Sequence, residues 1–220
     1  GTFTSLSDFA CEENLAQWAG DVAGCAITLS LRVDVEAATL LWDVLAVNQS
    51  AEPVRIDTVW VQDVGLASRG ALLSNEAYTA HYLDESVIQD VTCGPVLSFR
   101  QNLQQAGKNP WMMAVCLTGA ASYATDAFDV FGNGYRCGEG ASGLEQESLA
   151  NCCYQYEFSC AALQAKPVDL VAKQSAQFSF AAAYVADHPE ASSAADLSLL
   201  KGMRALSEQS ICDSLEVQSL

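Results

Sequence analysis

Apolar and polar residues alternate most regularly in the first third of the chain. Between residues 25 and 34, four apolar side chains (Ile27, Leu29, Leu31 and Val33) alternate with four polar ones (Thr28, Ser30, Arg32 and Asp34). Successive side chains of a strand point to opposite faces of its sheet. This period of two therefore predicts a strand with one buried face and one wet face.

Two further β-rich runs, 39–47 and 54–62, flank the polar segment NQSAEP. Pro53 ends this segment, and proline is tolerated at the start of a strand, where no ladder donor is needed. We therefore predict that residues 25–34, 39–47 and 54–62 are consecutive antiparallel strands that meet at a hairpin or a sandwich corner.

A tryptophan stands in each of the last two runs, Trp42 and Trp60. Aromatic side chains dominate the cores of β proteins, so both rings are expected on inward faces. The alternative is that the two rings form a sugar-binding platform. The core interpretation is favoured.

The middle of the chain gives weaker signals. Residues 65–110 fit either a helix that begins at Ser74 or Asn75 or a pair of strands. WMMAVCLTG, residues 111–119, is typical of a buried strand. The glycine-rich segment 120–148 predicts a loop.

The C-terminal part again shows clear patterns. Residues 170–189 predict a last sandwich strand, with one face formed by Phe178, Phe180 and Ala182. Ser193 and Asp196 have the spacing of a capping box, and an apolar stripe follows them at Leu199, Leu200, Met203 and Leu206. The spacing predicts a short C-terminal helix.

Together these elements predict a mainly β chain, a disulfide-stabilised antiparallel β-sandwich of immunoglobulin-like or jelly-roll type. Residues 1–23 are expected to form an N-terminal arm with a short helix from Ser7 or Asp8 through Ala16. The sandwich would cover residues 24–190, with a loop-rich insertion over about 65–150. Residues 191–220 would form the C-terminal helix and tail.

Cysteine usage supplies the disulfide part of this prediction. The chain has nine cysteines: Cys11, Cys25, Cys93, Cys116, Cys137, Cys152, Cys153, Cys160 and Cys212. They lack the paired C-x-x-C spacing of structural zinc sites, which favours disulfides and an exported protein. The pairs expected are Cys11 with Cys25, Cys93 with Cys116, and Cys137 with one of Cys152, Cys153 and Cys160. One thiol is then left without a partner.

Charge restricts the partners. The 27 acidic and 10 basic residues give a net charge of −17, which disfavours nucleic acid and anionic membrane surfaces. The sequence contains no apolar run long enough to cross a bilayer. Gly1 at the start suits a mature secreted chain, and Asn48 lies in a glycosylation sequon within the polar turn, so a secreted or cell-surface location is expected.

Catalytic patterns are scarce. His81 and His188 each have acidic neighbours and could serve as a general base, but the G-x-S-x-G elbow of a serine hydrolase is absent. His81, His188, Cys116 and Met112 provide the ligand types of a type-1 copper site without its characteristic spacing. No cofactor is expected from these residues.

One loop suggests a cation. Asp126, Asp129, Asn133 and Glu139 bring oxygen donors to a glycine-rich segment. Their spacing fails the EF-hand pattern, in which the glutamate stands at position twelve, so only an irregular calcium site fits.

These observations favour a non-catalytic extracellular structural or interaction protein, a repeating subunit of a filament, surface layer or larger complex. Self-association would use the N-terminal residues 1–10, with Phe3 and Phe9 docking on a neighbour, unless this arm folds back on its own domain. The alternative is a secreted hydrolase or carbohydrate-binding domain that uses aromatic and acidic residues of the 120–140 loop.

Overall fold

The computed structural model of the chain describes residues 4–156, 158–210 and 218–219. Its largest element is a nine-stranded antiparallel sheet. In spatial order the strands are β14 (Gln218–Ser219), β1 (Asp8–Glu12), β2 (Leu15–Val22), β3 (Cys25–Asp34), β4 (Thr39–Asn48), β13 (Ser175–Val185), β9 (Trp111–Cys116), β8 (Gly94–Gln101) and β7 (Leu83–Asp90). The mainly β class and the antiparallel pairing are therefore confirmed.

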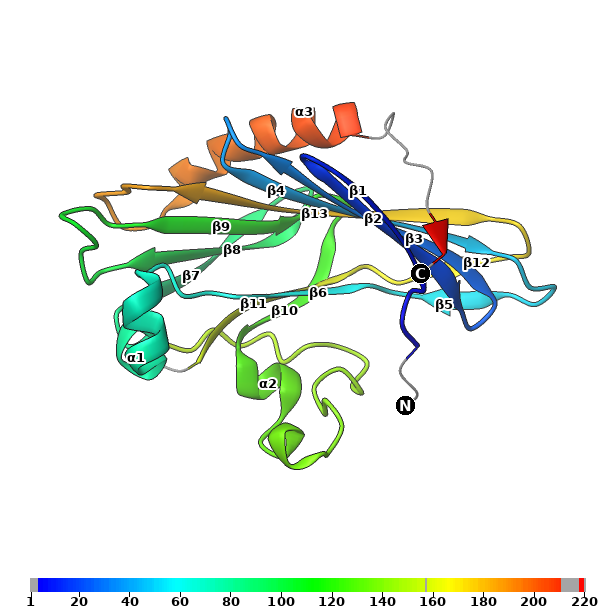
Figure 1. The fold of residues 1–220 in the computed structure, drawn as a ribbon, viewed down its shortest axis with the longest axis horizontal. Coiled ribbons are helices and arrows are strands. Elements are labelled where there is room, and N and C mark those ends of the chain that lie inside the picture. The colour runs from blue at the N-terminus through cyan, green and yellow to red at the C-terminus, as the bar shows by residue number, and fades with distance from the viewer. Residues whose placement is uncertain (1–3, 157, 211–217, 220) are drawn as a thin grey trace.

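Two smaller sheets lie below the large one (Figure 1). One contains, in spatial order, β10 (Ala120–Asp126), β11 (Ser159–Ala165) and β6 (Val59–Asp63), and the other contains β12 (Val168–Leu170) and β5 (Val54–Ile56). The division into nine, three and two strands differs from the two sheets of similar size in an immunoglobulin-like sandwich.

The strands predicted over residues 25–34 and 39–47 lie at the predicted positions. β3 and β4 pair antiparallel from Cys25 opposite Asn48 to Asp34 opposite Thr39, and β13 pairs with the other edge of β4. The third predicted run divides into β5 and β6, which leave the large sheet and join the two smaller ones. The polar turn after β4 is thus a sandwich corner, and the hairpin alternative is wrong.

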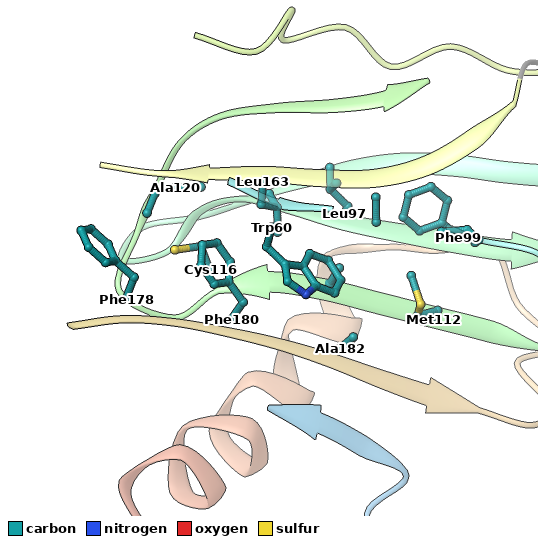
Figure 2. Packing of buried hydrophobic residues seen from close by; sticks show 14 of the residues in the cluster. Trp60, Leu97, Phe99, Met112, Cys116, Ala120, Leu163, Phe178, Phe180 and Ala182 are labelled. Atoms are coloured by element: carbon teal, nitrogen blue, oxygen red, sulfur yellow. The ribbon is translucent and has the colours of Figure 1, made fainter. Parts of the chain in front are cut away.

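The main core lies between the large sheet and β6 and β11. Figure 2 shows the Trp60 ring packed among side chains of both layers, including Leu163, Phe180 and Met112. Trp60 is 8% exposed, and its ring stacks on Phe180 at a centroid distance of 6.3 Å. The core interpretation is confirmed for Trp60, whereas Trp42 is half-buried and stacks on Trp18 of β2.

Helices cover the outer faces of both layers. The helix α3 (Leu200–Ser210) packs Leu200 and Met203 against the upper face of the large sheet (Figure 1). It follows the 3₁₀ turn η2 (Ala194–Leu199), where Ser193 and Asp196 form the predicted capping box. The short C-terminal helix is therefore confirmed. On the lower face, α2 (Ala127–Phe131) covers β10 and β11 with Val130.

The N-terminal helix prediction is wrong. Residues 8–22 form β1 and β2, whose Phe9 and Trp18 are cross-strand partners with ring centroids 5.3 Å apart. These rings extend the apolar inner face of β3, so cross-strand pairing prevails over the helix-capping signal of Ser7 or Asp8. Phe9 thus pairs within its own chain, and Phe3 lies outside the described residues.

The loop-rich insertion over 65–150 is also largely wrong. This stretch contains the helix α1 (Arg69–Ala80), strands β7 to β10, and α2. All six residues of β9 are buried, because the second layer covers one face and α3 the other. The buried strand predicted over residues 111–119 is therefore confirmed as β9. The longest irregular stretch among the described residues of this part is 132–156, with the 3₁₀ turn η1 at Tyr135–Cys137.

The disulfide prediction is wrong within the described residues. All eight described cysteines are free thiols, and Cys212 lies outside these residues. β2 lies between the strands of Cys11 and Cys25, which places the two backbones roughly 10 Å apart, beyond the reach of a disulfide. Cys116 packs between the sheets and Cys93 beneath α3, so these two thiols occupy different clusters.

Candidate functional site

A cleft of about 580 Å³ opens on the lower face of the molecule, a volume typical of small-molecule sites. Four segments that are far apart in the sequence form it: the end of β6, α1, the segment from α2 to η1, and the start of β11. The lining side chains include Asp63, Glu76, Phe128, Phe131, Asn133, Tyr135, Phe158, Ser159 and Cys160. Antiparallel pairing of β6 and β11 sets Asp63 opposite Cys160.

Aromatic rings form one wall of the cleft. Asp126 caps α2 by accepting a hydrogen bond from the Phe128 amide at 3.0 Å, which fixes the helix that carries Phe128 and Phe131. Phe128 meets Phe158 edge-on at 5.3 Å, and Phe131 lies 5.1 Å from Tyr135. Phe128 and Tyr135 are 44% and 48% exposed, so both offer ring surface to a ligand.

Two exposed carboxylates form the polar rim, and the buried Cys160 thiol lies beneath them. Asp63 ends β6, and Glu76 projects from α1. Burial, followed by the charges of Asp63, Asp126 and Glu85, raises the pKa of the Cys160 thiol to about 12. Cys160 therefore remains a neutral thiol near neutral pH and is no activated nucleophile.

The floor of the cleft connects to a buried carboxyl group. Ser159 is one of the lining residues, and its hydroxyl group donates a hydrogen bond of 2.5 Å to Oε1 of Glu85 on β7. Burial raises the pKa of Glu85 to about 7. Sequence analysis did not identify Glu85, although it stands between the inward-facing Leu83 and Val87 at strand spacing.

The predicted calcium ligands lie around the same segment. Asp126 is occupied as the cap of α2, and burial followed by repulsion from Asp126 raises the pKa of Asp129. Asn133 lines the cleft, while the Glu139 side chain lies against Gly134. In the part of the chain that the structure describes, no three His, Cys, Asp or Glu side chains gather as metal ligands. Calcium binding stays a prediction.

The two histidines do not form a shared site. His81 is exposed at the end of α1, whereas His188 stacks on Trp111 and its Nε2 lies 3.0 Å from Asp196. Cys116 and Met112 lie in the main core and complete no ligand set with them among the described residues.

The sequon asparagine has a structural role. Asn48 is fully buried, and its Nδ2 donates to the carbonyl oxygens of Glu52 and Leu170 at 2.8 and 3.0 Å. Its Oδ1 accepts from the amide and hydroxyl of Ser50. A glycan on Nδ2 would require this corner to open, so the geometry argues against glycosylation of the folded chain.

None of the helices within the described residues is long and apolar enough to span a membrane. The export prediction lost its main support with the disulfides, and the location stays a prediction.

Comparison with known proteins places this fold in context. A 111-residue stretch, 50% of the chain, is 38% identical to 1,2-β-oligoglucan phosphorylase of Listeria innocua serovar 6a. The alignment covers only 10% of that relative, so the aligned half of the chain corresponds to about a tenth of the relative's length.

Two solved structures share part of the arrangement. A polysaccharide lyase matches at a TM-score of 0.46 and 9% identity over 78% of this chain and 22% of the other. A protein described as a kojibiose phosphorylase from the human microbiome matches at 0.46 and 10% over 90% and 21%. Both TM-scores lie below 0.5, so neither likeness bears on function.

The family model described as the SOGP N-terminal domain matches residues 2–181, well over half of the chain. The curated relative that aligns with the chain is named as an enzyme of oligoglucans. The expectation of a self-assembling structural subunit of a filament or surface layer is therefore wrong, and the carbohydrate-related alternative agrees better with the comparisons. The chain belongs to the SOGP N-terminal domain family.

Proposed function

We propose that this chain is a domain of an enzyme that acts on 1,2-β-linked glucan oligosaccharides, and that its cleft binds a segment of the glucan. The observation that carries the proposal is the cleft itself, which exposed aromatic rings and exposed carboxylates line together. The 38% identity to a 1,2-β-oligoglucan phosphorylase supports the choice of sugar.

The residue types suit a neutral sugar. The faces of aromatic rings carry partial negative charge, and the C–H faces of a pyranose ring are complementary to them. Phe128 and Tyr135 offer such faces, while Asp63 and Glu76 offer acceptors for sugar hydroxyl groups. Apolar walls with a few converging polar groups are usual for a small-molecule site.

The charge argues for binding rather than phosphate-dependent chemistry in this cleft. Asp63 and Glu76 stand at its rim, and the whole chain carries a net charge of −17. This field repels a phosphate anion but not an uncharged glucan. In our proposal the bond-breaking step is carried out by other parts of a longer protein, and the domain holds the glucan.

Isothermal titration calorimetry with 1,2-β-glucan oligosaccharides tests the proposal, with 1,4-β- and 1,4-α-linked glucans as specificity controls. Phe128→Ala and Tyr135→Ala should each weaken binding roughly two- to tenfold, as expected for one stacking contact. Tyr184→Ala is the matched control, because Tyr184 is 45% exposed on β13 and does not line the cleft. Absence of binding to the 1,2-β-glucans, or an equal loss in the control, would overturn the proposal.

A further inference from the structure

One edge of β6 has no partner strand among the described residues. β6 is the last strand of the three-stranded sheet, and β11 is its neighbour on the other edge. Thr58 and Val64 use backbone groups to hydrogen-bond with β11. Because such bonds alternate in direction along an antiparallel strand, the amide and carbonyl groups of Val59, Val61 and Asp63 point toward the free edge.

The sequence of this edge lacks the usual protection against the addition of a strand. Native proteins commonly block a free edge with lysine, proline, a bulge or a covering loop. The stretch VWVQ of β6 contains neither a charge nor a proline, and its pairing with β11 is regular. The free backbone groups of this edge are therefore available to a further strand.

The large sheet extends beyond β6 as an apolar roof. Trp60 of β6 stacks on Phe180 of β13, and the large sheet continues from β13 through β4, β3, β2 and β1. Neighbouring strands lie about 4.8 Å apart, so the roof reaches roughly 15 Å past β6. Its inner face carries a cross-strand row of half-buried side chains, Phe9, Trp18 and Leu29. The lower layer thus ends before the apolar face above it does.

A cavity of about 290 Å³ lies where the roof passes over the edge of β6. Side chains of the two inner faces form most of its wall: Ile27, Leu29, Trp42, Val44, Trp60 and Gln62. Val59 and Val61 also line it, although their side chains pack on the opposite face of β6, so their backbone borders the cavity. Leu6 of the N-terminal arm lines it as well. An apolar cavity therefore lies beside the unpaired backbone groups.

A single extended strand satisfies both features. Its backbone would pair with β6 at about 4.8 Å, and every second side chain would point into the cavity and onto the roof. A second copy of the chain does not fit, because antiparallel pairing of two β6 edges places both roofs on the same side, where they collide. Asp57 and Asp63 flank the edge and the net charge is −17, so the added strand carries neutral or basic residues.

We propose that β6 and the roof receive one β-strand from a part of the natural polypeptide outside these 220 residues. This inference rests on the proposed function, in which the chain is a domain of a longer enzyme. The strand has apolar residues at alternate positions and completes the lower layer beneath β3. Because Asp63 at the end of β6 lines the cleft, the added strand also fixes the cleft relative to the rest of the enzyme.

Hydrogen–deuterium exchange followed by mass spectrometry, on the full-length protein and on the 220-residue chain, tests the inference. The amides of Val59, Val61 and Asp63 should exchange roughly tenfold or more slowly in the full-length protein than in the 220-residue chain. Val61→Pro removes an outward amide and no bond to β11, which an edge strand tolerates. In the full-length protein it should return Val59 and Asp63 to fast exchange. Val61→Thr keeps the amide and is the matched control, in which exchange should stay slow.

Leu29→Lys places a charge on the roof and should restore fast exchange in the full-length protein, which keeps the test decisive if Val61→Pro does not fold. Fast exchange in both wild-type proteins would overturn the inference. Slow exchange already in the 220-residue chain would also overturn it, and would assign the edge to the N-terminal arm, or to a second copy where protection rises with concentration.

A natural polypeptide with no residues beyond these 220 would equally exclude the added strand. Calorimetry with 1,2-β-glucan oligosaccharides decides the proposed function separately. Slowly exchanging amides in a protein that binds no glucan would overturn glucan binding and leave the strand in place. Glucan binding with fast-exchanging amides would overturn the strand alone.

Discussion

Replacement of Glu85 by glutamine should remove a specific component of the pH dependence of stability. In the folded chain burial raises the pKa of Glu85 from 4.5 to about 7. A raised pKa means that the folded state holds its proton more tightly than the unfolded state. The resulting stability is fully present below pH 4.5 and is lost as the pH rises through about 7.

The size of this component follows from the difference between the pKa of Glu85 in the folded and the unfolded chain. Each pKa unit corresponds to about 1.4 kcal/mol, so the interval from 4.5 to about 7 predicts a loss of about 3 kcal/mol. Glutamine has the same shape and no charge, so Glu85→Gln should lack this loss. Relative to the wild type, the variant should therefore gain about 3 kcal/mol between pH 4.5 and pH 8.

Urea unfolding followed by tryptophan fluorescence, repeated from about pH 4.5 to about pH 8.5, measures the difference. In the difference between the stability curves of Glu85→Gln and the wild type, the contributions of titrating groups that do not contact Glu85 cancel. Glu76→Gln is the control, because Glu76 is exposed and should leave the curve parallel to the wild type. Parallel curves for Glu85→Gln and the wild type would refute the buried, neutral Glu85 on which the reasoning depends.

Three further predictions concern the core, the thiols and the 126–139 segment. Trp60→Ala should lower the free energy of unfolding in urea by about 3–5 kcal/mol, because Trp60 is buried between the sheets. Trp42→Ala should lower it by less, because Trp42 is half-buried, and equal losses would contradict the observed packing. Thiol titration in denaturant without reductant should find at least eight reactive cysteines, and a much smaller number would restore the disulfide hypothesis. If calcium binds at residues 126–139, the unfolding temperature should be higher with calcium than with a chelator, and identical temperatures would argue against the site.

A strand was easier to predict from the sequence when one of its faces is exposed to solvent. β3, β4 and β13 each keep some solvent-exposed or polar positions, and their pattern predicted them. β9, buried on both faces by α3 and the second layer, was predicted from its continuous apolar run, whereas the nearly as buried β8 was not predicted on its own. The N-terminal strands were mistaken for a helix capped by Ser7 or Asp8, although Phe9 and Trp18 align across β1 and β2.

The disulfide error has a related cause. Cys25, Cys93, Cys116 and Cys160 are at most 2% exposed, and they fill the core as small apolar side chains. A count of cysteines contains no information about burial, and compartment was inferred from the count alone. The spatial order of the strands, with β2 between β1 and β3, would have been needed to exclude the first predicted pair.

The cleft was only partly predictable, and the reason is topological. The aromatic residues of the 120–140 segment were identified as a ligand surface, but Asp63 and Cys160 lie beside it only because β11 pairs with both β6 and β10, and Glu76 comes from the separate helix α1. Glu85 did leave a signal in the sequence: in LDESVIQD it takes the inward position between Leu83 and Val87. A carboxyl group at an inward strand position opposes folding unless it is neutral or paired, so the alternation of a strand is enough to single out such a position.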